Sequence, residues 1–162
     1  MSKPHCNTGF TLVELIVVLV LIGIIAVAAF PKIGLVQSDS YTTEFRDRLL
    51  NVLRHSQLQA MQNTTGSCHQ VIIVSTRFGQ HDCSNNALAS SFTNDFLGVS
   101  ETEATNANLA ISANGQAITN SFDIRFNALG QPTHGCTGGC TIEIAGTLTA
   151  TITIEPQGYI HR

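Results

Sequence analysis

A single carboxylate stands inside the most apolar stretch of this 162-residue chain. Between Phe10 and Phe30, Glu14 is the one formally charged side chain. Placing a carboxylate in hydrocarbon costs roughly 2.5–3.5 kcal/mol on insertion scales, so such a residue usually marks a function or a partner. The alternative is that Glu14 reaches back to the membrane interface, because it lies only about one turn inside the stretch.

A cation for Glu14 must come from outside the apolar stretch. Lys3 is the nearest basic side chain on the N-terminal side. A cut before Phe10 would create a free α-amino group about 6 Å along the helix axis from Glu14. Between neighbouring helices staggered in a bundle, that ammonium group and the carboxylate could neutralise each other in an apolar core.

Residues 1–9 are expected to be removed, whereas residues 10–30 are expected to remain in the mature protein. The first nine form a short polar leader that ends in Gly9, whereas the next 21 are apolar apart from Glu14. A helix of that length spans about 31 Å, close to the hydrocarbon core of a bilayer at about 30 Å. No small-x-small cleavage site follows it, so residues 10–30 should stay with the mature protein as a membrane-spanning helix. Lys3 in a short stub favours a cytoplasmic N-terminus.

Five cysteines are an awkward number for an oxidising compartment. Loss of the leader would remove Cys6 and leave four candidates for two disulfides: Cys68, Cys83, Cys136 and Cys140. The last two enclose a glycine-rich turn, and the first two bracket a predicted strand and its return. Four cysteines still allow three pairings.

Zinc is the competing chemistry for some of these cysteines. Cys68-His69 and His81-Asp82-Cys83 supply two groups of candidate ligands. Outside the inner membrane the environment favours disulfides, so we predict no metal.

Motifs of catalysis are sparse in this chain. It has no Gly-x-Ser-x-Gly, no phosphate-binding glycine loop and no two-histidine zinc helix. His55, His134 and His161 are isolated and are expected at the surface or in turns, and adjacent His-Asp-Cys at 81–83 is weak support for a triad. The net charge of −3, without a basic run, disfavours nucleic acid. We expect a non-enzymatic protein without a cofactor.

Residues 31–62 read as an amphipathic continuation of the apolar helix. Apolar residues recur at three- or four-residue spacing on one predicted face: Tyr41, Phe45, Leu49, Val52 or Leu53, Ala60 and Met61. Arg46, Arg48 and Arg54 fall mostly on other faces and are expected to be solvated, interleaved with Glu44 and Asp47. Asn63-Thr64-Thr65-Gly66 should end the helix.

Residues 63–162 are expected to form a small antiparallel β domain, which makes the fold α+β. The predicted strands are 70–76, 121–126, 140–144 and 148–154, with turns at 127–132 and 156–158. Between about 84 and 119 the pattern is weak, with short apolar pieces at 96–99 and 109–111. The strands should form a meander with one buried face and one threonine-rich wet face, and the apolar half of the helix should protrude from this domain.

The N-terminal residues resemble the class III prepilin signature of type IV pilins and of type II secretion pseudopilins. The resemblance rests on residues 9–15, GFTLVEL, the apolar helix behind them, and Pro31. It implies cleavage between Gly9 and Phe10 by a prepilin peptidase and N-methyltransferase, with methylation of the new Phe10. It also implies that Glu14 recruits and registers the subunit, and that Pro31 lies where pilin helices bend or melt.

Looser motifs resemble the GspH/FimT group of minor pilins and pseudopilins, and the minor pilins of mannose-sensitive haemagglutinin (MSHA) pili. They are residues 47–62, 126–132 and 154–161. The implied protein is a non-catalytic minor pilin of a bacterial inner membrane and then of a pilus, with a periplasmic C-terminal domain. Its implied partners are other pilins, the inner-membrane assembly platform and, before assembly, membrane lipid.

Three other functions stay open at this point. A GspH-like pseudopilin would act in a periplasmic secretion piston. A binding module would be a pilus-tip adhesin or a DNA-binding minor pilin. A membrane-anchored hydrolase would be supported only by activity of the domain that begins near residue 37.

Overall fold

The computed structural model describes residues 10–83, 88, 98–146 and 148–162, although the side chains of 27–40 and 82 lie outside the description. The chain divides into two compact units, residues 1–37 and residues 38–162. Helix α1, Leu12–Gln62, begins in the first unit and ends in the second. Its backbone continues through Pro31 and Gly34, so one helix carries both the apolar and the amphipathic sequence.

The second unit is built on one face of α1. Phe45, Leu49 and Leu53 are buried in a core that also takes in residues of both sheets and of a second helix. Tyr41 and Met61 were predicted on this face, but they are 38 % and 50 % exposed, so that part of the prediction is wrong. The helix ends at Gln62, directly before the predicted stop.

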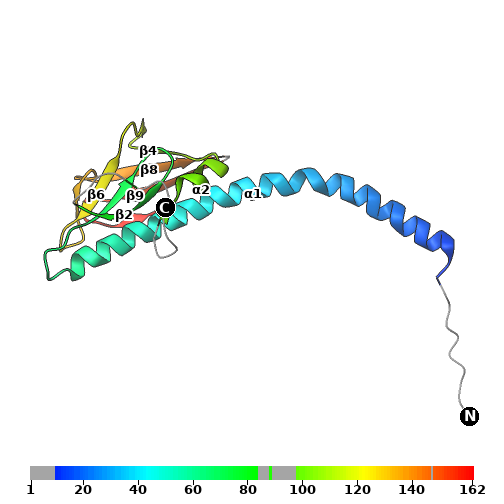
Figure 1. Ribbon diagram of the computed structural model, residues 1–162, viewed down its shortest axis with the longest axis horizontal. Helices are drawn as coiled ribbons and strands as arrows, with labels where there is room; N and C mark the ends of the chain where they lie inside the picture. The colour runs from blue at the N-terminus through cyan, green and yellow to red at the C-terminus, as the bar shows by residue number, and fades with distance from the viewer. Residues whose placement is uncertain (1–9, 84–87, 89–97, 147) are drawn as a thin grey trace, which may run out of the picture. The chain divides into compact units, whose positions relative to one another are not determined.

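The strands of the second unit form two antiparallel five-stranded sheets beside α1 (Figure 1). One sheet has the order β3-β2-β1-β6-β7 and the other has the order β10-β9-β8-β4-β5. The first consists of β1 His69–Ile73, β2 Phe78–Asp82, β3 Gly98–Val99, β6 Phe122–Phe126 and β7 Pro132–His134. The second consists of β4 Ala110–Ala113, β5 Gln116–Ala117, β8 Cys140–Ala145, β9 Thr149–Ile154 and β10 Ile160–His161.

The α+β prediction is confirmed, whereas the simple meander is wrong. Strands β8, β9 and β10 do follow one another, but β4 pairs with β8 and β6 pairs with β1. The threonine-rich pattern lies where it was expected, since Thr141 faces Thr153 in half-exposed pairs while Ile142 faces Ile152 in the core. Leu148 precedes β9 and is exposed, so the last long strand begins one residue later than predicted.

Helix α2, Glu101–Asn106, lies in the region of weak pattern and was not predicted. Its signal was nevertheless present, because Ser100 and Glu103 form a capping box. The Ser100 side chain accepts a hydrogen bond from the Glu103 N–H, and the Glu103 carboxylate accepts one from the Ser100 N–H. Ala104 anchors the short helix in the core. Of the predicted piece 96–99, residues 96 and 97 lie outside the described residues.

The arginines of α1 are partly solvated as predicted, since Arg54 is exposed, but Arg46 and Arg48 are half-buried and the arginines also bind within the chain. Arg48 donates to the Glu103 carboxylate at 3.0 Å and also to the Gly98 carbonyl. Arg54 donates to the Ile160 carbonyl at 3.0 Å, and Arg46 pairs with Asp47. These contacts attach α2, β3 and β10 to the polar flanks of the helix.

Acid should weaken the attachment of α2. Burial alone would raise the pKa of Glu103, but hydrogen bonds from Ser100 and Arg48 outweigh it and lower that pKa from its usual 4.5. A depressed carboxyl pKa stabilises the folded state fully above the usual value, and the gain is lost as the pH falls through the lowered value. We therefore expect the stability difference between wild type and Glu103→Gln to be small, because the carboxylate is half exposed, and to shrink below about pH 4.5. Urea unfolding of residues 38–162 at neutral and acid pH measures it, and a pH-independent difference would contradict the prediction.

Candidate processing and assembly segment

The apolar part of α1 begins with a hydrogen-bonded cap. Thr11 precedes the first helical residue, and its hydroxyl accepts a hydrogen bond from the Glu14 N–H at 3.3 Å. The Thr11 carbonyl accepts a hydrogen bond from the Leu15 N–H at 3.2 Å. Thr-x-x-Glu is the spacing of a capping box, and this cap was not predicted from the sequence. Glu14 thus lies in the first turn, where the helix dipole favours a negative charge.

The described side chains from Phe10 to Ala26 are all exposed within the chain. The large apolar ones range from 44 % exposed at Val18 to 80 % at Phe10. An apolar surface of this extent, on every side of a helix, requires a covering, and the described residues do not supply one.

Within the described residues, no helix has a stretch both long and apolar enough to cross a membrane. The last residues of the predicted span, 27–30, have side chains outside the description. The membrane span over 10–30 therefore stays a prediction.

The predicted cleavage junction is only half described. Gly9 lies outside the described residues, whereas Phe10 is described and exposed. The backbone of Pro31 is helical, and its side chain lies outside the description. Cleavage, methylation and the assembly roles of Glu14 and Pro31 stay predictions.

The comparison with known protein families points to the same segment. Residues 4–30 match the prokaryotic N-terminal methylation motif. This match covers Gly9, Phe10 and Glu14, and it supports a type IV pilin-like protein that a prepilin peptidase processes and that assembles with other pilins. It also favours a structural subunit over an enzyme. No curated protein and no solved structure matched the chain.

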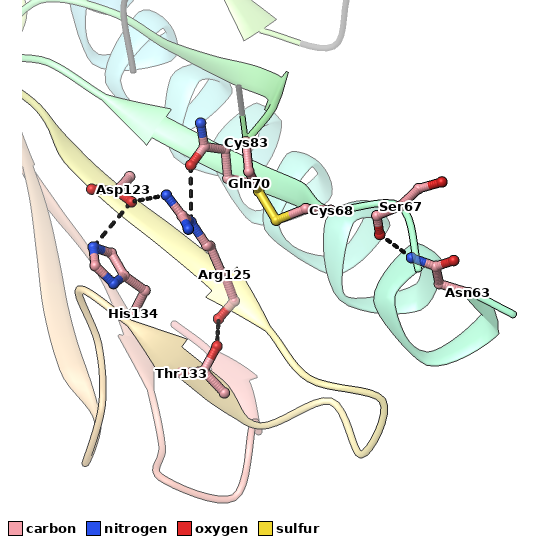
Figure 2. Close-up of a disulfide and its surroundings, with 9 residues drawn as sticks. All are labelled: Asn63, Ser67, Cys68, Gln70, Cys83, Asp123, Arg125, Thr133 and His134. Atoms are coloured by element: carbon pink, nitrogen blue, oxygen red, sulfur yellow. Dashed lines mark hydrogen bonds and ion pairs between the residues drawn. A yellow bond between two sulfur atoms is a disulfide. The ribbon is translucent and has the colours of Figure 1, made fainter. Parts of the chain in front are cut away.

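The cysteines pair as their positions in the sequence suggested. Cys68 and Cys83 form one disulfide, with Cα atoms 5.5 Å apart, and Cys136 and Cys140 form the other, with Cα atoms 5.1 Å apart. The first joins the start of β1 to the residue after β2 (Figure 2). Among the described residues, no cluster of three or more His, Cys, Asp and Glu could hold a metal. Cys6 and the Asp82 side chain lie outside the description.

A polar ladder lies on β1, β6 and β7 near the first disulfide (Figure 2). Buried Gln70 accepts a hydrogen bond from Arg125 Nε at 3.0 Å. Asp123 Oδ2 lies 3.3 Å from Arg125 Nη2 and 3.2 Å from His134 Nε2. Asp123 is mostly buried, so these partners offset the cost of burying its carboxylate.

The three histidines that were singled out from the sequence all have polar neighbours. His55 Nδ1 lies 3.0 Å from Gln80 Oε1, and His161 Nε2 lies 3.2 Å from Glu155 Oε1. His134 meets Asp123 through Nε2, the nitrogen that would face the nucleophile in a serine-protease triad. These contacts support structural roles.

Both disulfides should stabilise the domain, and to different degrees. Closing the longer loop between Cys68 and Cys83 should contribute about 3 kcal/mol through the unfolded state, and the shorter loop about 2 kcal/mol. We expect the Cys68→Ala, Cys83→Ala pair to lose more stability in urea unfolding than the Cys136→Ala, Cys140→Ala pair. Tandem mass spectrometry of unreduced protein checks the pairing. Four free thiols with bound zinc would overturn it.

Proposed function

We propose that this chain is a non-catalytic minor pilin of an MSHA-like type IV pilus. The observation that carries the proposal is one continuous helix. Its exposed apolar start lies within the match to the methylation motif and bears Glu14, and its other end is built into an α+β domain. Such a helix must be covered first by lipid and then by sister helices.

The proposed sequence of events follows from charge. Cleavage between Gly9 and Phe10 removes the polar leader and leaves an ammonium group on Phe10, which is then methylated. Methylation of an amine keeps its positive charge, so a cation remains for a carboxylate to meet. Glu14 of one subunit meets that ammonium group on a neighbouring subunit, and the two charges offset each other away from water.

The MSHA assignment, and within it the likeness to the minor pilin MshC, rests on three sequence segments. Residues 47–62 form the end of α1, and residues 126–132 and 154–161 contain two turns. The Gln57 side chain amide, from the first segment, donates to the Gly130 carbonyl of the second at 2.7 Å and to the Gly158 carbonyl of the third at 2.6 Å. The three segments that carry the resemblance therefore meet at one residue, which supports reading them as one shared structural feature.

A GspH-like pseudopilin of type II secretion is the alternative with the same N-terminal physics. Deleting the gene separates the two, since loss of surface pili supports the pilin and loss of exoprotein release supports the pseudopilin. A tip adhesin or DNA-binding minor pilin is a third possibility. DNA binding is disfavoured by the net charge and by Arg46, Arg48 and Arg125, which already pair with carboxylates.

Processing should depend on the junction before Phe10. Gly9→Val should leave uncleaved precursor in the membrane, because a branched side chain replaces the small residue at the predicted cut. N-terminal sequencing and intact mass of the wild-type protein should give a mature chain that starts at methylated Phe10. A mature wild-type protein that still began with Met1 would end the pilin proposal.

Glu14→Val should be cleaved normally but should enter filaments at least several-fold less well, because the neighbour's ammonium group loses its partner. The ratio of filament-bound to membrane-bound protein after shearing measures this. Thr11→Ala is the matched control, since it removes the hydroxyl of the helix cap and leaves the carboxylate in place. If Thr11→Ala fails as badly as Glu14→Val, the defect lies in the helix start and the pairing role is wrong.

A further inference from the structure

Two turns at the end of the globular domain are held side by side by one side chain. The Gln57 amide donates one hydrogen to the Gly130 carbonyl and the other to the Gly158 carbonyl. Gly130 and Gly158 have φ angles of +77° and +92°, and a β-carbon on Gly158 would overlap the Gly130 carbonyl. The close approach of the turns therefore requires glycine at position 158, and the positive φ favours glycine at both positions.

Each turn is also closed by its own hydrogen bonds. Asn127 Oδ1 accepts from the N–H groups of Leu129 and Gln131 at 3.0 and 2.9 Å. In the second turn, the Glu155 carbonyl accepts from the Gly158 N–H at 2.8 Å, and the Glu155 N–H donates to the Tyr159 carbonyl at 2.9 Å. Both turns are thus shaped before any partner binds.

These turns present large apolar side chains to solvent. Leu129 is 74 % exposed and Tyr159 is 67 % exposed. Leu129 precedes Gly130 and Tyr159 follows Gly158, the two glycines whose carbonyls accept hydrogen bonds from Gln57. Half-exposed Met61 lies beside Gly130, because its sulfur would be 3.0 Å from a β-carbon on that glycine. The Tyr159 ring stacks on His161 with centroids 5.1 Å apart, which restricts its orientation. We call Met61, Leu129 and Tyr159 the turn-pair surface.

Composition and rigidity make this surface suited to protein contact. Tyrosine and methionine are enriched at the cores of interfaces, and an ordered side chain loses little entropy on binding. Turns ordinarily carry Gly, Asn, Asp, Pro and Ser, so neither turn requires an exposed Leu or Tyr for its conformation.

The size of the turn-pair surface indicates what kind of partner it meets. Three such side chains expose on the order of 300 Å² together, whereas a stable complex of free proteins buries about 800 Å² on each partner. A surface this small acts only when another attachment already holds the partner close and raises its effective concentration. The exposed apolar helix is such an attachment, because its covering by sister helices would place globular domains side by side.

We propose that the turn-pair surface packs against the globular domain of a neighbouring pilin-like subunit in the assembled filament. This inference rests on the proposed function. Within the second unit the surface includes Met61 at the end of α1, whereas the chain enters that unit at residue 38. The partner offers an uncharged and partly apolar patch, since Met61, Leu129 and Tyr159 carry no charge at neutral pH.

The test uses the full chain in cells that assemble it, with Leu129→Glu and Tyr159→Glu. Each charge would have to be desolvated in the contact, so we expect at least a five-fold lower share of protein in sheared filaments, with normal cleavage before Phe10. Leu148→Glu is the matched control, because Leu148 is another exposed leucine in a turn, and it should assemble like wild type. Tyr159→Phe keeps the apolar ring and should also assemble normally, which separates contact loss from misfolding.

A photocrosslinking residue at position 129 identifies the partner, with position 148 as the control site. A 129-specific adduct with a pilin-like subunit supports the inference. Leu129→Glu and Tyr159→Glu variants that assemble as well as Leu148→Glu would overturn it, as would a 129-specific adduct with a protein that lacks the N-terminal methylation motif.

If both variants assemble normally but the pili no longer attach to a surface, the turns bind an external ligand and the subunit contact is wrong. Wild-type protein absent from filaments would refute the proposed function itself, whereas wild type that enters filaments with unaffected variants refutes only this inference.

Discussion

A single helix, α1, has one part packed in the core of a globular domain and another part that is apolar and exposed, and the rest of the structure depends on this constraint. Between residues 42 and 60, α1 buries a single stripe in the core of the globular domain, and Leu49 and Leu53 are completely covered there. Between Phe10 and Ala26 the same helix is apolar and exposed on every side. Residues 42–60 are covered by the globular domain. Residues 10–26 need other molecules to cover them, since no side chain of the described residues does so.

Polar side chains on the flanks of the buried stripe fix the positions of several loops and strands against α1. Hydrophobic packing places a sheet against a helix without dictating where each loop ends. Hydrogen bonds from Arg48, Arg54 and Gln57 to carbonyls of β3, β10 and two turns fix these segments in place. The same polar flank that orders the fold thereby orders the turn-pair surface, so stability and the proposed contact with a neighbouring subunit share the Gln57 amide.

Glu14 has a structural and a proposed functional role that are compatible. Glu14 lies in the first turn of α1, where the helix dipole complements a negative charge. In the proposed filament the same carboxylate meets an ammonium group of a neighbouring subunit. The helix cap at Thr11 uses the backbone N–H of Glu14, so this hydrogen bond does not compete with pairing of the carboxylate.

The sequence by itself determined the features that depend on neighbours along the chain. Periodicity predicted strands at 121–126, 140–144 and 148–154, and the structure has strands at 122–126, 140–145 and 149–154, because each pattern repeats within a few residues. Cysteine spacing suggested both disulfides, since a strand and its return bring Cys68 and Cys83 together. The capping residues Thr11 and Ser100 are equally local signals, although neither cap was predicted. Only the tertiary structure decided that β1 lies beside β6 and β4 beside β8, and that Gln57 joins two distant turns. Those contacts join residues up to 101 positions apart, and many strand orders would bury the same alternating side chains, so no local pattern distinguishes them.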